Sequence, residues 1–279
     1  MKARVFVGTK HATAIPADDR GFGYGDGLFE TMRAHHGDVP WWDAHWSRLA
    51  RGAARLRLAL PDQVRVHLEA RRLLDGGDGV LKLIVSRGSG GRGYAPVETS
   101  TPTWVLSCHP LPAAFPPDGL MLRWCETRLA LQPALAGMKH CNRLEQVLAR
   151  AEWQILPAPE CHADEGLMRS GEGDVVCATA ANLFILAAGR WMTPRIDRCG
   201  VEGICRAWAM AALAAAESRL EVADIESADA VFLCNAARGI LPVARLGERA
   251  WLPHPQVLAL QRRLAAEHPA FTALPTELS

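Results

Sequence analysis

A lysine placed just before a helix is the most chemically suggestive residue of this chain of 279 residues. Lys139 lies in the segment LAGMKHCNRLEQ, after small and apolar residues. The chain has four lysines (Lys2, Lys10, Lys82 and Lys139), and the remaining 27 of its 31 basic residues are arginines. Arginine stays protonated, whereas a lysine amine in an apolar pocket loses its proton readily and forms a Schiff base with a carbonyl group. Taken alone, Lys139 is equally well explained as a surface residue of an arginine-rich chain.

Three arginines lie in settings that suit anionic ligands. Arg48, in the segment HWSRL, lies on an amphipathic stretch from which its guanidinium could reach a phosphate with two hydrogen bonds. Arg87 and Arg92 flank the glycines of SRGSGGRGY, a pattern that suits carboxylate recognition at the mouth of a site. The alternatives are a solvated helix arginine and a flexible hairpin loop.

Two short segments could bind a phosphate through backbone N–H groups. Gly203 and Ile204 begin a predicted helix in VEGICR, and the N-terminus of a helix favours an anion. Asn235 and Ala236 follow a predicted buried strand in LCNAA. An ordinary helix start and an ordinary strand exit remain the alternatives.

No segment has the ligand spacing of a metal site, so we expect no metal. His35 and His36 are adjacent and are predicted to point apart in a strand, and His11 stands alone. The eight cysteines include no Cys-x-x-Cys pair, which favours free thiols in a reducing compartment.

Composition excludes several classes of protein. The net charge is +1 without a long basic run, which argues against nucleic acid as the main partner. No segment approaches the roughly 20 apolar residues of a membrane span, and no secretory leader is evident. We therefore expect a soluble cytoplasmic protein that does not bind membranes and acts on a small molecule.

The apolar periodicity predicts an α/β (α+β) fold without the regular alternation of a barrel or a dinucleotide-binding domain. Strands are predicted at 1–7, 28–33, 80–86, 104–108, 120–126 and 230–234, with several short strands before residue 195. Helices are predicted at 43–58, from Pro61 to about Gly76, at 142–155, at 203–218 and at 255–267. Four prolines stiffen residues 109–118, where we predict a linker between an N-terminal domain (1–108) and a C-terminal domain (119–279).

Taken together, these segments resemble the fold-type IV family of pyridoxal-phosphate enzymes and, within it, the 4-amino-4-deoxychorismate lyases. The resemblance extends from DRGFGYGDGLFET to VFLCNAARGILPV, over nearly the whole chain. Its most specific segments are LKLIVSRGSGGRGY, AGMKHCNRLEQVLARAEW and AANLF. It implies two α/β domains with the cofactor in the cleft between them, in a homodimer.

The resemblance also implies roles for single residues. Lys139 would bind the aldehyde of pyridoxal 5′-phosphate and move protons, and Thr31 would assist proton transfer near the substrate. The cofactor phosphate would be held by Arg48 and by two backbone segments, Gly203-Ile204 and Asn235-Ala236. Arg87 and Arg92 would face the substrate carboxylates.

The sequence departs from the family pattern at Cys177. Family members carry a glutamate five residues before the Asn of AANLF, where it pairs with the nitrogen of the cofactor ring. Here that position is Cys177, and Glu172 is too far upstream to replace the glutamate. A thiol cannot hold the ring nitrogen in its protonated form, so the cofactor should withdraw electrons less strongly. Transamination should suffer most, whereas a lyase reaction that ends in an aromatic ring should tolerate the change.

The resemblance therefore implies a lyase that converts 4-amino-4-deoxychorismate to 4-aminobenzoate and pyruvate in folate biosynthesis. One alternative is a fold-type IV aminotransferase acting on branched-chain or D-amino acids. Another is a homologue that has lost catalysis and acts as a dimeric binding protein. Cys177 gives the second alternative some support, and the presence of Lys139, Arg48 and Asn235 argues against it.

Overall fold

The computed structural model describes residues 2–96, 100–154 and 163–272. The chain divides into two compact units. Unit 1 comprises Met1–Pro112 and Met138–Asn142, and unit 2 comprises Ala113–Gly137 and Arg143–Ser279. Lys139, which lies in the sequence range of the predicted C-terminal domain, thus belongs to unit 1. The ranges 1–108 and 119–279 remain a prediction for independently folding domains.

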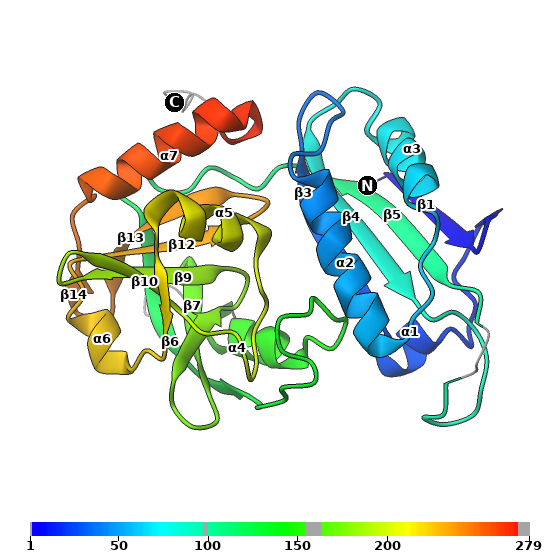
Figure 1. Cartoon of the computed structure of the whole chain (residues 1–279), viewed down its shortest axis with the longest axis horizontal. Coiled ribbons are helices and arrows are strands. Elements are labelled where there is room, and N and C mark those ends of the chain that lie inside the picture. Colours follow the sequence, from blue (N-terminus) through cyan, green and yellow to red (C-terminus); the bar gives the residue numbers. More distant parts are fainter. Residues whose placement is uncertain (1, 97–99, 155–162, 273–279) are drawn as a thin grey trace. The chain divides into compact units, whose positions relative to one another are not determined.

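Unit 1 is built on a five-stranded antiparallel sheet with the strand order β2-β1-β5-β4-β3. Its strands are β1 (Lys2–Val7), β2 (Lys10–Ala12), β3 (Gly27–Ala34), β4 (Gly79–Ser86) and β5 (Thr103–His109). Helix α1 (Arg20–Tyr24) precedes β3, and α2 (Trp42–Leu56) and α3 (Gln63–Leu74) connect β3 to β4. Helix α2 packs on β3 and α3 on β5 (Figure 1).

The sequence of α2 explains why this helix lies on the sheet. Its buried residues recur every three or four positions, so they form one stripe that faces β3. That stripe contains two polar side chains, His45 and Arg48, among Trp42, Leu49 and Ala53. On β3, Leu28, Glu30 and Met32 alternate toward the helix. Polar groups from both elements are therefore buried in the same layer.

Unit 2 contains a nine-stranded mixed sheet with the order β11-β10-β9-β12-β13-β6-β7-β8, to which β14 is added beside β13. Its strands are β6 (Leu120–Leu129), β7 (Glu165–Ser170), β8 (Val175–Ala178), β9 (Asn182–Ala187), β10 (Arg190–Pro194), β11 (Ala216–Ser218), β12 (Ala230–Asn235), β13 (Gly239–Leu246) and β14 (Arg249–Ala250). Because the terminal strand β8 also lies near β9, the sheet curls back on itself.

The helices of unit 2 pack around this sheet (Figure 1). They are α4 (Leu144–Gln154), α5 (Ile204–Leu213), α6 (Val222–Glu226), α7 (Pro255–Glu267) and the 3-10 turn Pro269–Phe271. Helix α4 contacts β6 and β7, α5 contacts β12, and α7 contacts β13. The main core contains Leu122, Leu167, Leu183, Val231 and Leu241, all at most 5% exposed.

Most predicted elements are confirmed within a few residues, and the helix predicted at 203–218 is wrong in its second half. Helix α5 ends at Leu213, where Ala214 adopts a left-handed backbone with φ of 48°. Ala216–Ser218 then form β11, parallel to β10. The alanine-rich sequence favours a helix, but pairing with a sheet edge outweighs this local preference. Helix α3 also begins later than Pro61, at Gln63, because the Asp62 carboxylate accepts a hydrogen bond from the Arg65 N–H at 2.8 Å.

Among the described residues, every helix is too short or too polar to cross a lipid bilayer.

Candidate active site

The segment around Lys139 is fixed to the first residues of β3. The Phe29 N–H donates to the Lys139 carbonyl at 2.9 Å, and the Cys141 N–H donates to the Gly27 carbonyl at 2.9 Å. Gly25 has a left-handed backbone with φ of 64°, which favours glycine, and a Cβ there would lie 2.2 Å from the side-chain oxygen of Asn142. These contacts hold the Lys139 backbone beside β3.

The Lys139 side chain lies against an aromatic ring on that strand. Its Nζ is 4.4 Å from the centre of the Phe29 ring, and the Lys139 side chain is half-buried. Residues two apart on a strand share a face, so Thr31 lies on the same face of β3 as Phe29. Thr31 pairs with Lys82 on β4, whose Nζ is 5.2 Å from the Phe29 ring. The structure thus brings two predicted residues, Lys139 and Thr31, to one face of one strand.

The opposite face of β3 carries a buried polar cluster formed by Glu30, His45 and Arg48, which we call the Glu30 cluster. Arg48 Nε donates to Glu30 Oε1 at 2.8 Å, and Arg48 Nη2 makes a second, short hydrogen bond to Oε2. His45 Nδ1 lies 2.7 Å from Glu30 Oε2. The three side chains are at most 6% exposed. Two nitrogens of the predicted phosphate-binding arginine are therefore held in place by Glu30.

Charge compensation keeps Glu30 ionised. Burial alone would raise the pKa of Glu30, but the charge of Arg48 and the hydrogen bonds from His45 and Arg48 lower it to about 2. For His45, burial lowers the pKa more than Glu30 raises it. We therefore describe His45 as a neutral imidazole that donates from Nδ1 to Glu30. Its Nε2 atom is buried without a hydrogen-bond partner in the described part of the chain.

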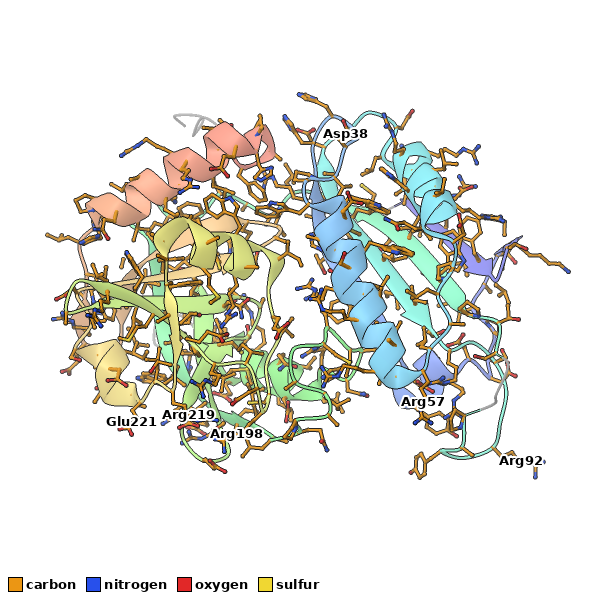
Figure 2. All side chains as sticks on the ribbon, viewed as in Figure 1. Asp38, Arg57, Arg92, Arg198, Arg219 and Glu221 are labelled. Carbon is orange, nitrogen blue, oxygen red and sulfur yellow. The ribbon has the colours of Figure 1, made fainter. Side chains whose placement is uncertain are left out.

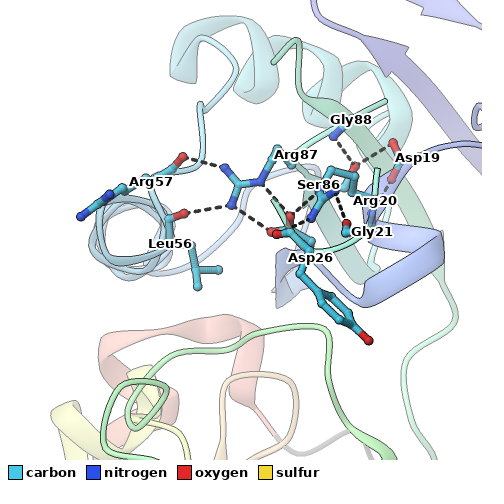
Figure 3. A network of polar contacts seen from close by, with 11 residues as sticks. Asp19, Arg20, Gly21, Asp26, Leu56, Arg57, Ser86, Arg87 and Gly88 are labelled. Atoms are coloured by element: carbon cyan, nitrogen blue, oxygen red, sulfur yellow. Dashed lines mark hydrogen bonds and ion pairs between the residues drawn. The ribbon is translucent and has the colours of Figure 1, made fainter. Parts of the chain in front are cut away.

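A second polar cluster, the Asp26 cluster, surrounds the carboxylate of Asp26 (Figure 3). Arg20 Nε donates to Asp26 at 3.0 Å, and Arg87 donates to both carboxylate oxygens at 2.7 and 3.0 Å. Arg87 also donates to the carbonyls of Leu56 and Arg57 at the end of α2, at 2.9 and 2.8 Å. Arg87 is only 6% exposed, so its guanidinium is directed at structural partners. Its predicted role with substrate carboxylates remains a prediction.

The loop that carries Arg92 is tied to the same cluster. Arg20 donates to the carbonyls of Gly93 and Tyr94, at 3.0 and 3.3 Å. The rings of Tyr24 and Tyr94 meet edge to face, with centres 5.8 Å apart. The Arg92 side chain itself is exposed and extends away from the ribbon (Figure 2). The backbone of this loop is anchored, while Arg92 is accessible to a ligand.

In unit 2, the start of α5 has the properties of an anion site. Gly203 is its N-cap and provides no side-chain cap. A Cβ at Gly203 would lie 2.0 Å from Asn182 Oδ1, so a larger residue there would displace the Asn182 side chain. Asn182 also donates to the Val201 carbonyl at 2.9 Å. The first N–H groups of a helix lack intrahelical partners, and the helix dipole favours negative charge beside them. Gly203 and Ile204 therefore fit a phosphate.

The second predicted phosphate segment lies next to α5. The thiols of Cys205 and Cys234 are hydrogen-bonded, which places the start of α5 against the end of β12. Asn235 Oδ1 accepts from the N–H groups of Ala237 and Arg238, at 3.0 and 2.8 Å. The Asn235 side chain thus shapes the turn, and Ala236 forms its tip. The structure brings Gly203, Ile204, Asn235 and Ala236 to one end of unit 2.

Cys177 lies on β8 in a buried cluster that we call the Cys177 cluster. Its members include Cys125, Trp153, Met168 and Ile196, and Cys177 is 8% exposed. Burial is the main cause that raises the pKa of Cys177, to about 12, and the neighbouring Cys199 and Glu165 raise it further. The thiol is therefore neutral and cannot carry the negative charge of the family's glutamate.

A buried carboxylate that the sequence analysis missed lies in this region. Glu165, on β7, is 7% exposed. It accepts a short hydrogen bond from Thr179 Oγ1 and hydrogen bonds from the Gly166 N–H at 3.0 Å and Arg150 at 3.1 Å. Its partners belong to unit 2, and its charge contributes to the raised pKa of Cys177 and Cys125.

Sequence reasoning also missed Glu30 and Asp26. Glu30 lies within the FET segment, and the alternation of β3 could have shown that Glu30 faces α2 when Thr31 faces the other way. No local pattern connects Asp26 to Arg87, 61 residues away. His35 and His36 were predicted to point apart, which is wrong: their ring centres are 4.0 Å apart. His36 has a left-handed backbone with φ of 49°, which breaks the alternation of the strand.

The family profile of aminotransferase class IV matches residues 27–246, most of the chain. The chain belongs to this family. Members of the family depend on pyridoxal phosphate. The match covers both units and every predicted site residue.

Individual relatives fall into two groups of activities. The chain is 35% identical to an aminodeoxychorismate lyase from Vibrio harveyi over 83% of its own length and 87% of the relative. It is 30% identical to a putative branched-chain-amino-acid aminotransferase from Methanocaldococcus jannaschii, covering 88% of this chain and 86% of that one. The crystal structure of 4-amino-4-deoxychorismate lyase from Pseudomonas aeruginosa superimposes with a TM-score of 0.86 at 39% identity, over 95% of this chain and 99% of that chain.

Proposed function

We propose that this protein is a pyridoxal-phosphate-dependent lyase that converts 4-amino-4-deoxychorismate to 4-aminobenzoate and pyruvate. The observation that carries the proposal is the position of Lys139, whose amine lies over Phe29 on the face of β3 that also carries Thr31. The similarity to two lyases, at 35% and 39% identity over most of the chain, supports the choice of reaction.

The chain offers groups that suit the aldehyde and the phosphate of pyridoxal phosphate. Lys139 offers the amine that holds its aldehyde. The start of α5 at Gly203 and Ile204 and the turn at Ala236 offer backbone donors to a phosphate. Arg48 supplies a positive charge whose orientation Glu30 fixes. When bound, pyridoxal phosphate would withdraw electrons from the carbon that bears the substrate amine.

The residues of the chain would then perform two proton transfers. The free amine of Lys139 would take the proton from the amine-bearing carbon. The bond between the ring and the enolpyruvyl oxygen would break, and the ring would become aromatic. Lys139 or the hydroxyl of Thr31 would supply the proton that converts the departing enol to pyruvate. The shared face of β3 supports this division of work, because Thr31 lies on the same face as Phe29, whose ring Lys139 Nζ contacts.

The Cys177 cluster favours the lyase over an aminotransferase. Its thiols are neutral at ordinary pH, because burial raises the pKa of Cys177 to about 12 and that of Cys125 likewise to about 12. A neutral thiol beside the cofactor ring would leave its nitrogen less protonated. Formation of an aromatic ring supplies a strong driving force, which transamination lacks. The 30% identity to a putative aminotransferase keeps branched-chain transamination as the second candidate.

The setting of the enzyme is part of the same proposal. The product 4-aminobenzoate would place the reaction in folate biosynthesis. The resemblance to fold-type IV enzymes supports a homodimer. The seven described cysteines are free thiols, which supports a cytoplasmic location.

The test is a product assay with a matched control. Purified protein, pyridoxal phosphate and aminodeoxychorismate should give equal amounts of 4-aminobenzoate and pyruvate. Lys139→Ala should abolish both products, whereas Lys82→Ala removes the other amine near Phe29 and should retain turnover. Transfer of the amino group to a 2-oxo acid without formation of 4-aminobenzoate would instead identify an aminotransferase. Absence of both reactions would favour a binding protein.

A further inference from the structure

We propose that His35, His36 and Asp78 form a binding site for a divalent transition-metal ion such as Zn²⁺. In the described part of the chain, these three side chains form a group of potential metal ligands whose ligand atoms lie close together. They lie at one end of the unit 1 sheet, where His35 and His36 follow β3 and Asp78 precedes β4. The proposal does not depend on the function proposed above.

The backbone explains why two adjacent histidines face the same way. His36 has φ of 49°, so its side chain does not alternate with that of His35 as in a regular strand. The two rings lie with their centres 4.0 Å apart. Histidine is among the residues that tolerate this left-handed backbone. The turn is closed by paired hydrogen bonds between His35 and Asp38, at 2.8 and 3.0 Å.

Asp78 is held against this turn by backbone contacts. The His36 N–H donates to Asp78 Oδ1 at 2.7 Å, and the Gly37 N–H donates to the Gly77 carbonyl at 3.0 Å. A Cβ at Gly37 would lie 2.9 Å from Gly76 Cα, so the two loops approach as closely as glycine allows. The ligand groups are therefore brought together by the fold before any ion binds.

The distances suit a small ion with nitrogen and oxygen ligands. His35 Nδ1 and His36 Nδ1 lie 3.3 and 3.8 Å from Asp78 Oδ1, and the ligand atoms of all three residues lie within 4.8 Å of one another. Ligand atoms about 2.0–2.1 Å from a tetrahedral Zn²⁺ are separated by roughly 3.4 Å, so the ligand side chains would move inward when an ion binds. The His36 and Asp78 side chains are 79% and 40% exposed, which leaves the remaining position to water.

The charges nearby select the class of metal. Asp78 also interacts with Arg33, and Asp38 lies 3.7 Å from Arg71, so the surroundings are not strongly acidic (Figure 2 labels Asp38). Ca²⁺ and Mg²⁺ prefer oxygen ligands, and here only one carboxylate is offered. Two imidazoles suit Zn²⁺, Co²⁺, Ni²⁺ and Cu²⁺. An ion bound here would link the loop after β3 to the loop before β4.

The test uses Co²⁺ and Zn²⁺ as probes on the full-length chain without an affinity tag. We expect one Co²⁺ per chain, displaced by Zn²⁺ and not by Mg²⁺. The Co²⁺ spectrum should lack the intense near-ultraviolet band of thiolate ligation, because no cysteine belongs to the site. Zn²⁺ should also raise the melting temperature, since it binds the folded state.

Three variants identify the ligands. His36→Asn keeps a residue that tolerates the left-handed backbone, and Asp78→Asn keeps an acceptor for the His36 N–H. Each should lower the affinity by at least the roughly 10–100-fold that loss of a supporting contact costs at a metal site. His35→Gln, at a position with ordinary backbone, serves as the third variant if either of these fails to fold. His11→Ala removes an exposed histidine elsewhere in unit 1 and should bind like the wild type. The proposal is overturned by a lack of saturable binding, by a thiolate band, or by wild-type affinity in the folded ligand variants.

Discussion

The Glu30 cluster of unit 1 and the Cys177 cluster of unit 2 are both buried, but the first contains ionised side chains and the second contains neutral thiols. In the first, a carboxylate with a pKa of about 2 is surrounded by an arginine and a histidine. In the second, thiols with pKa values near 12 lie among Trp153, Met168 and Ile196. The difference teaches that the Glu30 cluster fixes charge at the predicted phosphate-binding arginine, whereas the thiols of the Cys177 cluster stay neutral. We therefore expect a site that binds the cofactor and transfers protons, and in which the cofactor ring withdraws electrons only weakly.

Removal of Glu30 should have the largest effect on stability. Glu30→Ala leaves Arg48 buried without its carboxylate, and breaking a buried ion pair costs about 3–5 kcal/mol. Glu69→Ala is a matched control, because Glu69 is also buried but its partners Arg4 and Arg72 are more exposed and can turn to water. Urea unfolding should show a clearly smaller loss for the control. Equal losses would show that the Glu30 cluster is no stronger than an ordinary ion pair.

Lowering the pH should remove the contribution of the Glu30 cluster to stability over a defined pH range. The pKa of Glu30 is lowered from 4.5 to about 2, so its contribution is fully present above about pH 4.5 and is lost as the pH falls toward 2. The shift corresponds to about 3 kcal/mol. The difference in unfolding free energy between the wild type and Glu30→Gln should therefore shrink between pH 5 and pH 2. A difference that is constant with pH would contradict an ionised Glu30.

Arg48→Ala should lower the affinity for the cofactor more than Glu30→Gln does. A charge-assisted hydrogen bond contributes about 1.5–3 kcal/mol, so affinity for pyridoxal phosphate should fall by roughly one to two orders of magnitude. Glu30→Gln keeps the guanidinium and should lower affinity less. Fluorescence titration with pyridoxal phosphate measures both. Unchanged affinity in Arg48→Ala would place the phosphate elsewhere.

The smallest effect is expected from a substitution that places a buried carboxylate in the Cys177 cluster, as in the Glu30 cluster, and the effect is on activity. Cys177→Glu would introduce a carboxylate, and it should raise side transamination more than lyase turnover, because only transamination depends fully on a protonated ring nitrogen. Cys177→Ser, which adds no charge, is the control. The measurement is the ratio of transamination to lyase turnover in each variant and in the wild type. If both variants leave that ratio as in the wild type, Cys177 is simply a small residue of the core.

The sequence predicts the regular elements well where one pattern dominates, and poorly where distant groups meet. The stripe of α2 and the buried strands follow from apolar spacing alone. The end of α5 does not, because the residues after it pair with the distant strand β10 as β11. Lys139, Arg48 and the start of α5 were recognised from local segments. Glu30 and Asp26 were missed because their importance comes from partners on other elements. The orientation of His36 was missed because it depends on one left-handed residue.

The most direct test of the account is to find which amine holds the cofactor. Borohydride reduction of the protein with bound pyridoxal phosphate, followed by digestion and mass spectrometry, fixes the cofactor to the lysine that binds it. The position of Lys139 over Phe29, on the face of β3 that carries Thr31, predicts a single labelled peptide that contains Lys139. A label on Lys82, which lies 5.2 Å from the same ring, or the absence of any labelled peptide would contradict the central claim.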